Sequence, residues 1–451
     1  MSPCCLLALL ALIPLTLAAN PGVKVKLTDK GIEYGKQIGM ASLQQKLKTI
    51  KVPDLSGTEK VPHVGKVKYS LTGMTIVNLG LPKSALVLVP GTGVSLAITN
   101  AFINLHGNWR VRYFRFMQDR GSFDLAVNGL TITANIAIKS DETGRPMVST
   151  VNCVANVEAL NTMLYLKRCE NTLADAITDM NQHLKTFNVL AKVDQYAEIE
   201  YSMGTSPTIS KSSMEFSLKG EFYNIVKHQE PPFSPTPFSL PPQGNNMLYI
   251  GVSSFTPNSA GFVYNNAGAL SLYVTDDMIP PSSPIRLNTG TFGVFIPEIA
   301  KRFPGMMMKL LVKTVKEPTI SLEPNNVTVQ ASGTVTAYAI QPNTTLSPLF
   351  VLNMEGSVSA QLNVTGVKLA GAITLNKIEM TLGTSYVGQF QVQSLDNIFL
   401  MVLKVVVIPK VNARLEKGFP LPSIGKMNLV NTQLQVLKDY MLIGTDVQFT
   451  G

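Results

Sequence analysis

Cations and aromatic side chains alternate in one short segment, residues 109–116, which reads WRVRYFRF. Further lysines lie in a turn region around Pro62. Guanidinium groups offer forked donors to phosphate oxygens, and aromatic rings can contact acyl chains or sugars. The pattern therefore predicts a binding surface for an anionic, partly apolar ligand, although a strand face that meets only water would show the same spacing. The cations of these two segments are Lys60 and Lys66 in the turn region and Arg110, Arg112 and Arg115 in the alternating segment, with Arg120 following.

Signatures of catalysis and of metal binding are missing from the sequence. The histidines are far apart and none has the spacing of a metal ligand pair. Residues 93–97 (GVSLA) come nearest to a nucleophile elbow but lack its last glycine. We therefore expect a binding protein and not an enzyme, with no metal and no other cofactor. No nucleic-acid recognition module accompanies the basic segment, so we expect no nucleic acid among the partners.

The first nineteen residues have the form of a secretory signal peptide. An apolar run from Leu6 to Leu12 is followed by Pro14 and by small residues at Ala18 and Ala19. This run is too short to span a bilayer, and no later segment reaches eighteen apolar residues. We expect the protein to be secreted and extracellular.

Two cysteines, Cys153 and Cys169, remain after the signal peptide. An even pair in an oxidising compartment predicts one disulfide, and a metal site from two cysteines alone is the weaker alternative. Acceptor sequences for N-linked glycans occur only in the second half, at Asn326, Asn343 and Asn363.

A proline-rich linker at residues 230–243 divides the chain into two nearly equal parts. Its six prolines exclude a helix interior or a central strand and favour an extended segment. We expect an N-terminal lobe at residues 20–229 and a C-terminal lobe at 244–451. The first carries a net charge of about +7 and the second about +3, and an electropositive lobe attracts anionic partners. Hydrophobic residues make up 45% of the chain, which indicates a large core or an apolar cavity.

Alternating apolar and polar residues predict antiparallel strands in both halves, for example over 67–71, 94–98 and 123–138. Helical spacing predicts a helix from Asp29 to about Ile50 and a second one through Leu173, Ile177 and Leu184. We expect the second helix to begin near Glu170. In the second half, residues 295–303 favour a helix, residues 398–408 fit a helix or a buried strand, and residues 418–422 form a turn.

Several segments, in order along the whole mature chain, resemble the family of bactericidal/permeability-increasing protein and lipopolysaccharide-binding protein, within the tubular lipid-binding superfamily. The matching segments are NPGV at 20–23, LKTIKVPD at 47–54, GSFDL at 121–125, PPFSPTP at 231–237, MLYIG at 247–251, GFPLP at 418–422 and LIGTD at 442–446.

The resemblance implies an α+β fold: a boomerang of two lobes, each a twisted antiparallel sheet wrapped around a long helix, with a central sheet between them. It implies an apolar pocket for phospholipid in each lobe. It also implies that the basic tip of the first lobe engages the lipid A phosphates of lipopolysaccharide, with Lys60, Lys66, Arg110, Arg112 and Arg115 in the matching loops. Cys153 and Cys169 enclose only fifteen residues. The family's cysteines are farther apart, and the missing piece should include a strand and the start of the second long helix.

The function that this family implies is that of a secreted, monomeric innate-immune protein. It would bind lipopolysaccharide on the outer membrane of Gram-negative bacteria and kill or neutralise them. A lipopolysaccharide carrier that serves a host receptor is one alternative, and a plasma transfer protein for phospholipid or neutral lipid is another. The charge of the first lobe favours the first two over the third.

Overall fold

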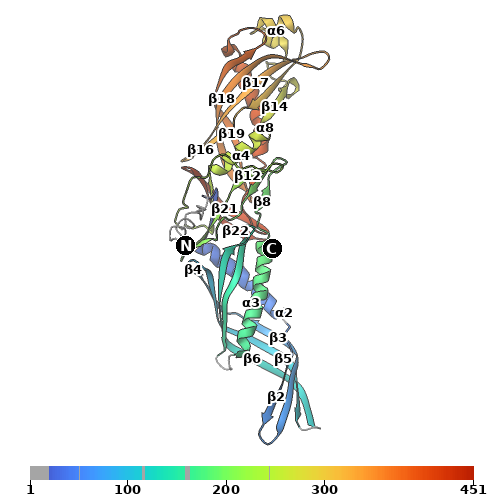
Figure 1. Cartoon of the computed structure of the whole chain (residues 1–451), viewed down its shortest axis with the longest axis vertical. Helices are drawn as coiled ribbons and strands as arrows, with labels where there is room; N and C mark the ends of the chain where they lie inside the picture. Colours follow the sequence, from blue (N-terminus) through green and yellow to red (C-terminus); the bar gives the residue numbers. More distant parts are fainter. Residues whose placement is uncertain (1–19, 50, 114–116, 158–162, 243, 451) are drawn as a thin grey trace, which may run out of the picture.

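A computed structural model describes residues 20–49, 51–113, 117–157, 163–242 and 244–450. The molecule is long and gently bent, with one lobe at each end and a sheet between them (Figure 1). The expected α+β architecture of two lobes and a central sheet is confirmed. The expected signal peptide lies outside the described residues. In the part of the chain that is described, no helix is long and apolar enough to cross a membrane.

The first lobe is a six-stranded antiparallel sheet with two long helices along it (Figure 1). Helix α2 (Asp29–Thr49) lies where the sequence predicts it, and the alternating residues 123–138 form part of one long strand. The second helix is α3 (Met163–Leu184). The sheet runs in the order β2 (Leu55–Val61), β3 (Gly65–Gly80), β5 (Gly93–Tyr113), β6 (Met117–Ser140) and β7 (Pro146–Val157), and β4 (Lys83–Val89) pairs with β5.

The start of α3 corrects one sequence prediction. We expected the helix to begin near Glu170, but it begins at Met163, seven residues earlier. The chain leaves β7 at Val157 and returns along it as α3, and Asn181 fixes this packing. Its side chain accepts a hydrogen bond from the Val148 amide and donates one to the Val148 carbonyl, both of 2.9 Å. Cys153 on β7 is buried and disulfide-bonded. Its predicted pairing with Cys169 stays a prediction, because the side chains of residues 157–172 are not described.

The central sheet takes strands from both halves of the sequence. Strand β1 (Val23–Thr28) pairs with β11 (Ser213–Leu218) on one side and with β13 (Leu248–Ser253) on the other, so it joins the lobes directly. Ile250 and Ile443 are fully buried in the core beneath. The remaining strands are β10 (Thr208–Ile209), β22 (Tyr440–Phe449) and β21 (Met427–Leu437), and a small sheet of β8 (Leu190–Lys192), β9 (Ala197–Glu200) and β12 (Glu221–Asn224) lies against them.

The proline-rich linker is fastened along this sheet. The Lys26 ammonium donates to the Pro241 carbonyl at 3.0 Å, and the Phe233 ring contacts the rings of Phe255 and Phe262 edge-on. The linker is therefore extended, as its prolines require, and held at several points. The domain limits that we expect at 229 and 244 stay predictions.

The second lobe repeats the plan with a larger core. Its sheet runs in the order β14 (Ser271–Thr275), β15 (Met308–Thr314), β17 (Asn326–Ile340), β18 (Leu346–Thr365), β19 (Lys368–Ser385) and β20 (Phe419–Pro420), and β16 (Thr319–Glu323) pairs with β17. The rings of Phe292, Phe350 and Phe399 meet in the core, with centroids 6.2 to 6.4 Å apart. The helices and helical turns are α4 (Phe255–Asn266), η1 (Asp276–Met278), α5 (Thr289–Gly293), α6 (Pro297–Arg302), η2 (Val392–Leu395), α7 (Asp396–Val402), η3 (Leu403–Val407) and α8 (Ile408–Leu415).

Two predictions for this lobe are decided by the structure. The apolar run 398–408 is helical, within a continuous α7–η3–α8 segment. The segment 418–422, expected as a turn, instead contributes the short strand β20, because Phe419 and Pro420 pair with Leu369 and Lys368.

Candidate functional site

Two hairpins form one four-stranded ribbon at the far end of the first lobe (Figure 1). We call it the distal ribbon: residues 55–72 of β2 and β3 together with residues 108–113 and 117–123 of β5 and β6. Helices α2 and α3 cover the sheet nearer the middle of the molecule and leave this ribbon uncovered (Figure 1). Both of its faces are therefore open to a ligand.

One face of the distal ribbon carries a group of cations, which we call the basic face. Residues directly opposite each other in an antiparallel pair point to the same side of the sheet. Arg110 lies opposite both Ser70 and Arg120, so the face continues across three strands. The pairs in register are Lys60 with Lys66, Lys68 with Arg112, and Arg110 with Arg120. All of these side chains are exposed, and none forms an ion pair with a carboxylate among the described residues.

This arrangement does not serve folding. Like charges directly opposite each other across two strands destabilise a sheet, by roughly 0.2–1 kcal/mol for a pair. Neighbouring strands lie about 4.8 Å apart, so the cations are close enough to share one phosphate or two. A group of uncompensated cations at this spacing is what a polyanionic ligand requires.

A shallow hollow at the β2–β3 turn adds to the basic face. It has a volume of about 440 Å³, and both Lys60 and Lys66 line it with His63. The turn depends on left-handed backbone, with φ of 64° at His63 and 89° at Gly65. Glycine adopts such a φ without strain, so Gly65 lets the turn close and brings the two lysines together.

The opposite face of the distal ribbon is apolar, and we call it the aromatic face. Two rings lie flat across neighbouring strands because a glycine stands beneath each. A Cβ at Gly57 would fall 2.4 Å from the Tyr69 ring, and one at Gly121 would fall 2.8 Å from the Trp109 indole nitrogen. Val61, Tyr69 and Met117 are exposed, while Glu59 and Asp119 lie at the two edges of this face. The ribbon thus offers charge on one side and apolar surface on the other.

The structure brings four of the five predicted ligand-binding residues onto one face: Lys60, Lys66, Arg110 and Arg112. Arg115 lies outside the described residues. The predicted set of binding residues did not include Lys68 and Arg120, which complete the basic face. The signal for Lys68 was its spacing by two from Lys66 along one strand, whereas Arg120 shares the face only through its register with Arg110. The cross-strand register that unites the strands cannot be read from a single sequence.

A second charged cluster fixes the start of the linker to the small sheet. The Lys219 ammonium lies 3.2 Å from Glu230, 3.6 Å from Glu200 and 3.8 Å from Glu221. Glu221 is buried, and its Oε1 has no hydrogen-bond partner in the described structure. Burial raises the pKa of Glu221, whereas the hydrogen bond from Lys219 lowers the pKa of Glu230. This cluster positions the linker and lies in the middle of the molecule, away from the distal ribbon.

The other predicted sites are exposed or isolated. Within the described ranges, no three His, Cys, Asp or Glu side chains group as a metal site would require. The predicted glycan acceptors have exposed side chains, and each contacts the threonine of its own sequence motif. These acceptors are Asn326 with Thr328, Asn343 with Thr345 and Asn363 with Thr365.

Comparison with known proteins agrees with this architecture. The model of the N-terminal domain of the LBP / BPI / CETP family matches residues 31–187, and the model of its C-terminal domain matches residues 191–449. The chain belongs to this family. The resemblance inferred from the sequence is therefore confirmed.

Individual family members align over the whole chain. The bactericidal permeability-increasing protein of Sebastes schlegelii is 69% identical, covering 99% of both chains. The lipopolysaccharide-binding protein of Homo sapiens is 33% identical, covering 99% of this chain and 98% of the relative. A crystal structure of lipopolysaccharide binding protein is similar with a TM-score of 0.62 and 32% identity, covering 96% of this chain and 100% of that one.

Proposed function

We propose that this protein is a secreted innate-immune factor that binds lipopolysaccharide of Gram-negative bacteria through the distal ribbon. The observation that carries the proposal is the basic face, where six cations lie in register with no carboxylate partner among the described residues. Lipid A presents phosphates beside acyl chains, and the ribbon presents cations on one face and aromatic side chains on the other. The names of the aligned relatives, a bactericidal permeability-increasing protein and lipopolysaccharide-binding proteins, support the same ligand.

Each face has its own role in this proposal. Arginine and lysine on the basic face hold the phosphates through charge-assisted hydrogen bonds. Trp109, Tyr69 and Met117 on the aromatic face contact acyl chains at the rim of the lipid layer. Near an anionic membrane each exposed cation contributes about 1 kcal/mol of attraction, so six cations recruit the protein strongly at low salt.

We also propose that the first lobe accommodates phospholipid acyl chains between α2 and the sheet. The core there is small, and apolar side chains around it remain only partly buried, unlike the dense core of the second lobe. The side chains concerned are Met40, Leu43, Leu81, Leu96, Ile103 and Ile132. A bound acyl chain would bury them and would account for the apolar composition of the chain.

The decisive experiment compares two matched triple variants of the full-length protein. The first variant changes Lys60, Lys66 and Lys68 to alanine and so removes three cations from the basic face. The control variant changes Lys316, Lys404 and Lys410 to alanine and so removes the same charge from exposed positions of the second lobe. We expect only the first variant to lose lipopolysaccharide binding, by at least tenfold. Equal losses in both variants would show that net charge, and not the distal ribbon, determines binding.

The carrier function is the second candidate, and it shares the same ligand. The 32% identity and TM-score of 0.62 to lipopolysaccharide binding protein support it, while the 69% identity to a bactericidal relative supports killing. The purified protein added to Gram-negative cells and to reporter immune cells separates the two. Loss of viable bacteria supports the first function, and sensitisation of reporter cells to lipopolysaccharide supports the second.

A further inference from the structure

The end of the molecule opposite the distal ribbon exposes several apolar side chains on segments that adjoin α5 and α6. We call them the apical surface: Val294, Phe295, Met307 and Tyr386, at the turns that surround α5 and α6. Val294 is 76% exposed and Phe295 40%, although they are adjacent in sequence. Two adjacent large apolar side chains are thus both open to solvent, and contiguous exposed apolar surface marks an interaction site.

The turn that presents Val294 and Phe295 is firmly anchored. Phe292 before it and Ile296 after it are buried in the core of the lobe. A Cβ on Gly293 would fall 2.5 Å from the Ala300 side chain, so α5 and α6 pack in direct contact on either side of these residues. The apolar pair is therefore held in place by a rigid base, which is the condition for a preformed contact surface.

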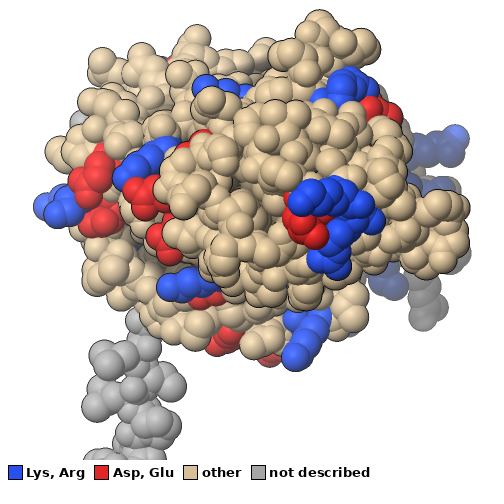
Figure 2. Space-filling view, turned by 90° about the horizontal axis from the view of Figure 1, so that it is seen from above, with Lys and Arg blue, Asp and Glu red and all other residues tan. Residues whose placement is uncertain are grey.

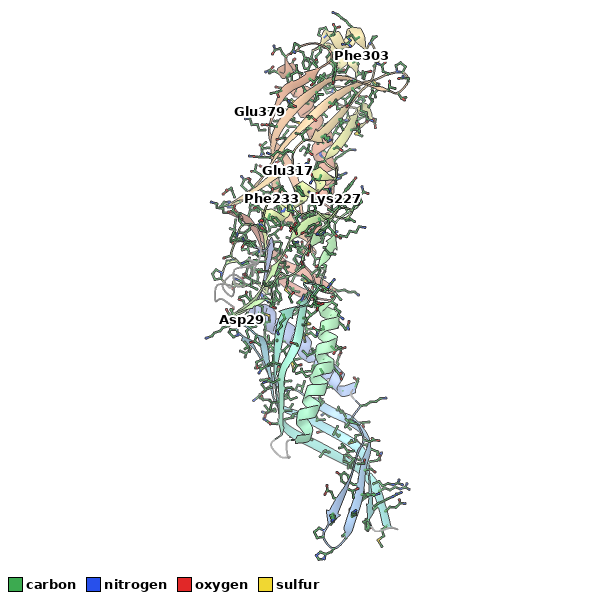
Figure 3. The ribbon with its side chains drawn as sticks, in the orientation of Figure 1. Asp29, Lys227, Phe233, Phe303, Glu317 and Glu379 are labelled. Carbon is green, nitrogen blue, oxygen red and sulfur yellow. The ribbon has the colours of Figure 1, made fainter. Side chains whose placement is uncertain are left out.

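The apical surface is almost free of net charge. The flanking segments 341–350 and 382–395 contain no Asp, Glu, Lys or Arg. Lys301 pairs with Glu298 at 3.8 Å, and the Arg302 guanidinium lies 5.6 Å from the centre of the Phe303 ring. Figure 2 looks onto this end and shows a mostly tan face on which blue and red groups stand in separate clusters, most of them with both colours. Figure 3 places Phe303 at the same extremity.

We propose that the apical surface docks onto a neutral, zwitterionic phospholipid layer, with Val294 and Phe295 inserted among the acyl chains. An anionic or cationic partner would find little opposite charge there, whereas a zwitterionic layer requires none. Arg302 beside the turn is exposed and is an amphipathic type that favours the level of lipid headgroups, with its apolar stem inward and its charged end in water. The protein would then contact anionic lipid with one end and neutral lipid with the other.

The test uses full-length protein and vesicles of pure phosphatidylcholine in a flotation assay. The variant Val294→Asp with Phe295→Asp places two charges on the apical surface. The matched control is Val226→Asp with Val315→Asp, which adds the same charges at valines that are 91% and 60% exposed elsewhere. We expect the first variant to bind these vesicles at least tenfold more weakly, and the control to bind like the unaltered protein. Both should keep their binding to lipopolysaccharide, which separates this proposal from the proposed function.

A fluorescence measurement locates the contact independently. The chain has one tryptophan, Trp109, so the variant Trp109→Phe with Phe295→Trp has its only indole on the apical surface. We expect its emission to shift to the blue when phosphatidylcholine vesicles are added. The proposal is wrong if the unaltered protein does not float, if the Asp variant floats equally well, or if the indole at 295 stays in water. It is also wrong if sedimentation velocity shows a dimer that the Asp variant dissociates, because a second copy then covers this surface.

Discussion

Lys68 on β3 lies directly opposite Arg112 on β5, so two cations share one site on the distal ribbon with no carboxylate partner among the described residues. Strand register places their Cβ atoms about 5 Å apart, a distance at which like charges repel. A sheet under selection for stability alone would place opposite charges here. The pair is therefore unfavourable for the sheet by itself, and under the proposed function the phosphates of the ligand neutralise it.

The first prediction separates binding from folding at this pair. Changing Lys68 and Arg112 together to threonine removes the repulsion and keeps two residues that favour strands. We expect the melting temperature to stay equal or to rise slightly, while affinity for lipopolysaccharide falls at least tenfold. Differential scanning fluorimetry and a binding titration test this. A fall in melting temperature that matches the fall in binding would mean that the pair is structural.

The second prediction concerns the aromatic face. Gly121 lies beneath Trp109, and a Cβ there would come within 2.8 Å of the indole. We expect Gly121→Ala to displace the ring, weaken lipopolysaccharide binding several-fold and reduce the blue shift of tryptophan emission on binding. Gly204→Ala is the control, because the space around its Cβ is open. The interpretation fails if both glycine variants bind and shift alike.

The third prediction concerns how salt weakens the binding of lipopolysaccharide to the basic face. Attraction to the basic face is electrostatic, and the Debye length shortens from about 10 Å at 0.1 M salt to about 3 Å at 1 M. We therefore expect the affinity of the unaltered protein for lipopolysaccharide to fall steeply over this range. The Lys60, Lys66 and Lys68 triple alanine variant should show a clearly shallower dependence. Parallel salt curves for the two proteins would argue that the cations do not contact the ligand.

The linker cluster gives a pair of pH predictions with opposite signs. Burial raises the pKa of Glu221 above its unfolded value, so ionisation disfavours the fold as pH rises through the folded pKa. The hydrogen bond from Lys219 lowers the pKa of Glu230, so its contribution is present above the unfolded pKa and is lost as pH falls through the folded pKa. We expect Glu221→Gln to raise the melting temperature at pH 7.4 and Glu230→Gln to lower it slightly.

The difference in melting temperature between each glutamine variant and the parent should shrink as the pH is lowered toward and below 4.5, because glutamine resembles the protonated acid. Melting curves of the three proteins between pH 4 and pH 8 check this. A Glu221→Gln variant that is less stable than the parent at pH 7.4 would show that its ion pair with Lys219 outweighs the cost of burial.

The sequence predicts the fold well where patterns are local. The helix predicted from Asp29 and the strands with alternating residues lie as expected. Long-range relationships are harder, because the identity of a residue does not specify its partner strand. Arg120 joins the basic face only through its register with Arg110. Phe419 and Pro420 become a strand only because β19 lies beside them. The run 398–408 was ambiguous because a buried helix and a buried strand can both be uniformly apolar.

The shared central sheet was implied by the family resemblance and not by any local pattern. Strand β1, at the start of the chain, pairs with β13 from beyond the linker. Removing the second half would leave one edge of β1 without its partner, and exposed strand edges favour association between chains. For this reason the experiments above use the full-length protein and not an isolated lobe.

The last prediction concerns the short loop between Cys153 and Cys169. Had the helix continued directly from Val157, Cys169 would lie too far along it to meet Cys153. In the structure β7 ends at Val157 and α3 begins at Met163 and runs back along β7, as the hydrogen bonds between Asn181 and Val148 show. Cys153 lies roughly 13 Å before the end of its strand, and Cys169 lies about 9 Å beyond the start of its helix. The two positions are therefore at similar heights on antiparallel elements, which is the geometry that a disulfide needs.

We expect thiol labelling of the unreduced, denatured mature protein to find no free thiol, and prior reduction to expose two. Reduction should destabilise the protein by about 3 kcal/mol, the chain-entropy value for a loop of this length, and lower the melting temperature measurably. The variant with both cysteines changed to serine should resemble the reduced protein and should no longer respond to reductant. Two labelled thiols without reduction would show that Cys153 and Cys169 do not pair with each other.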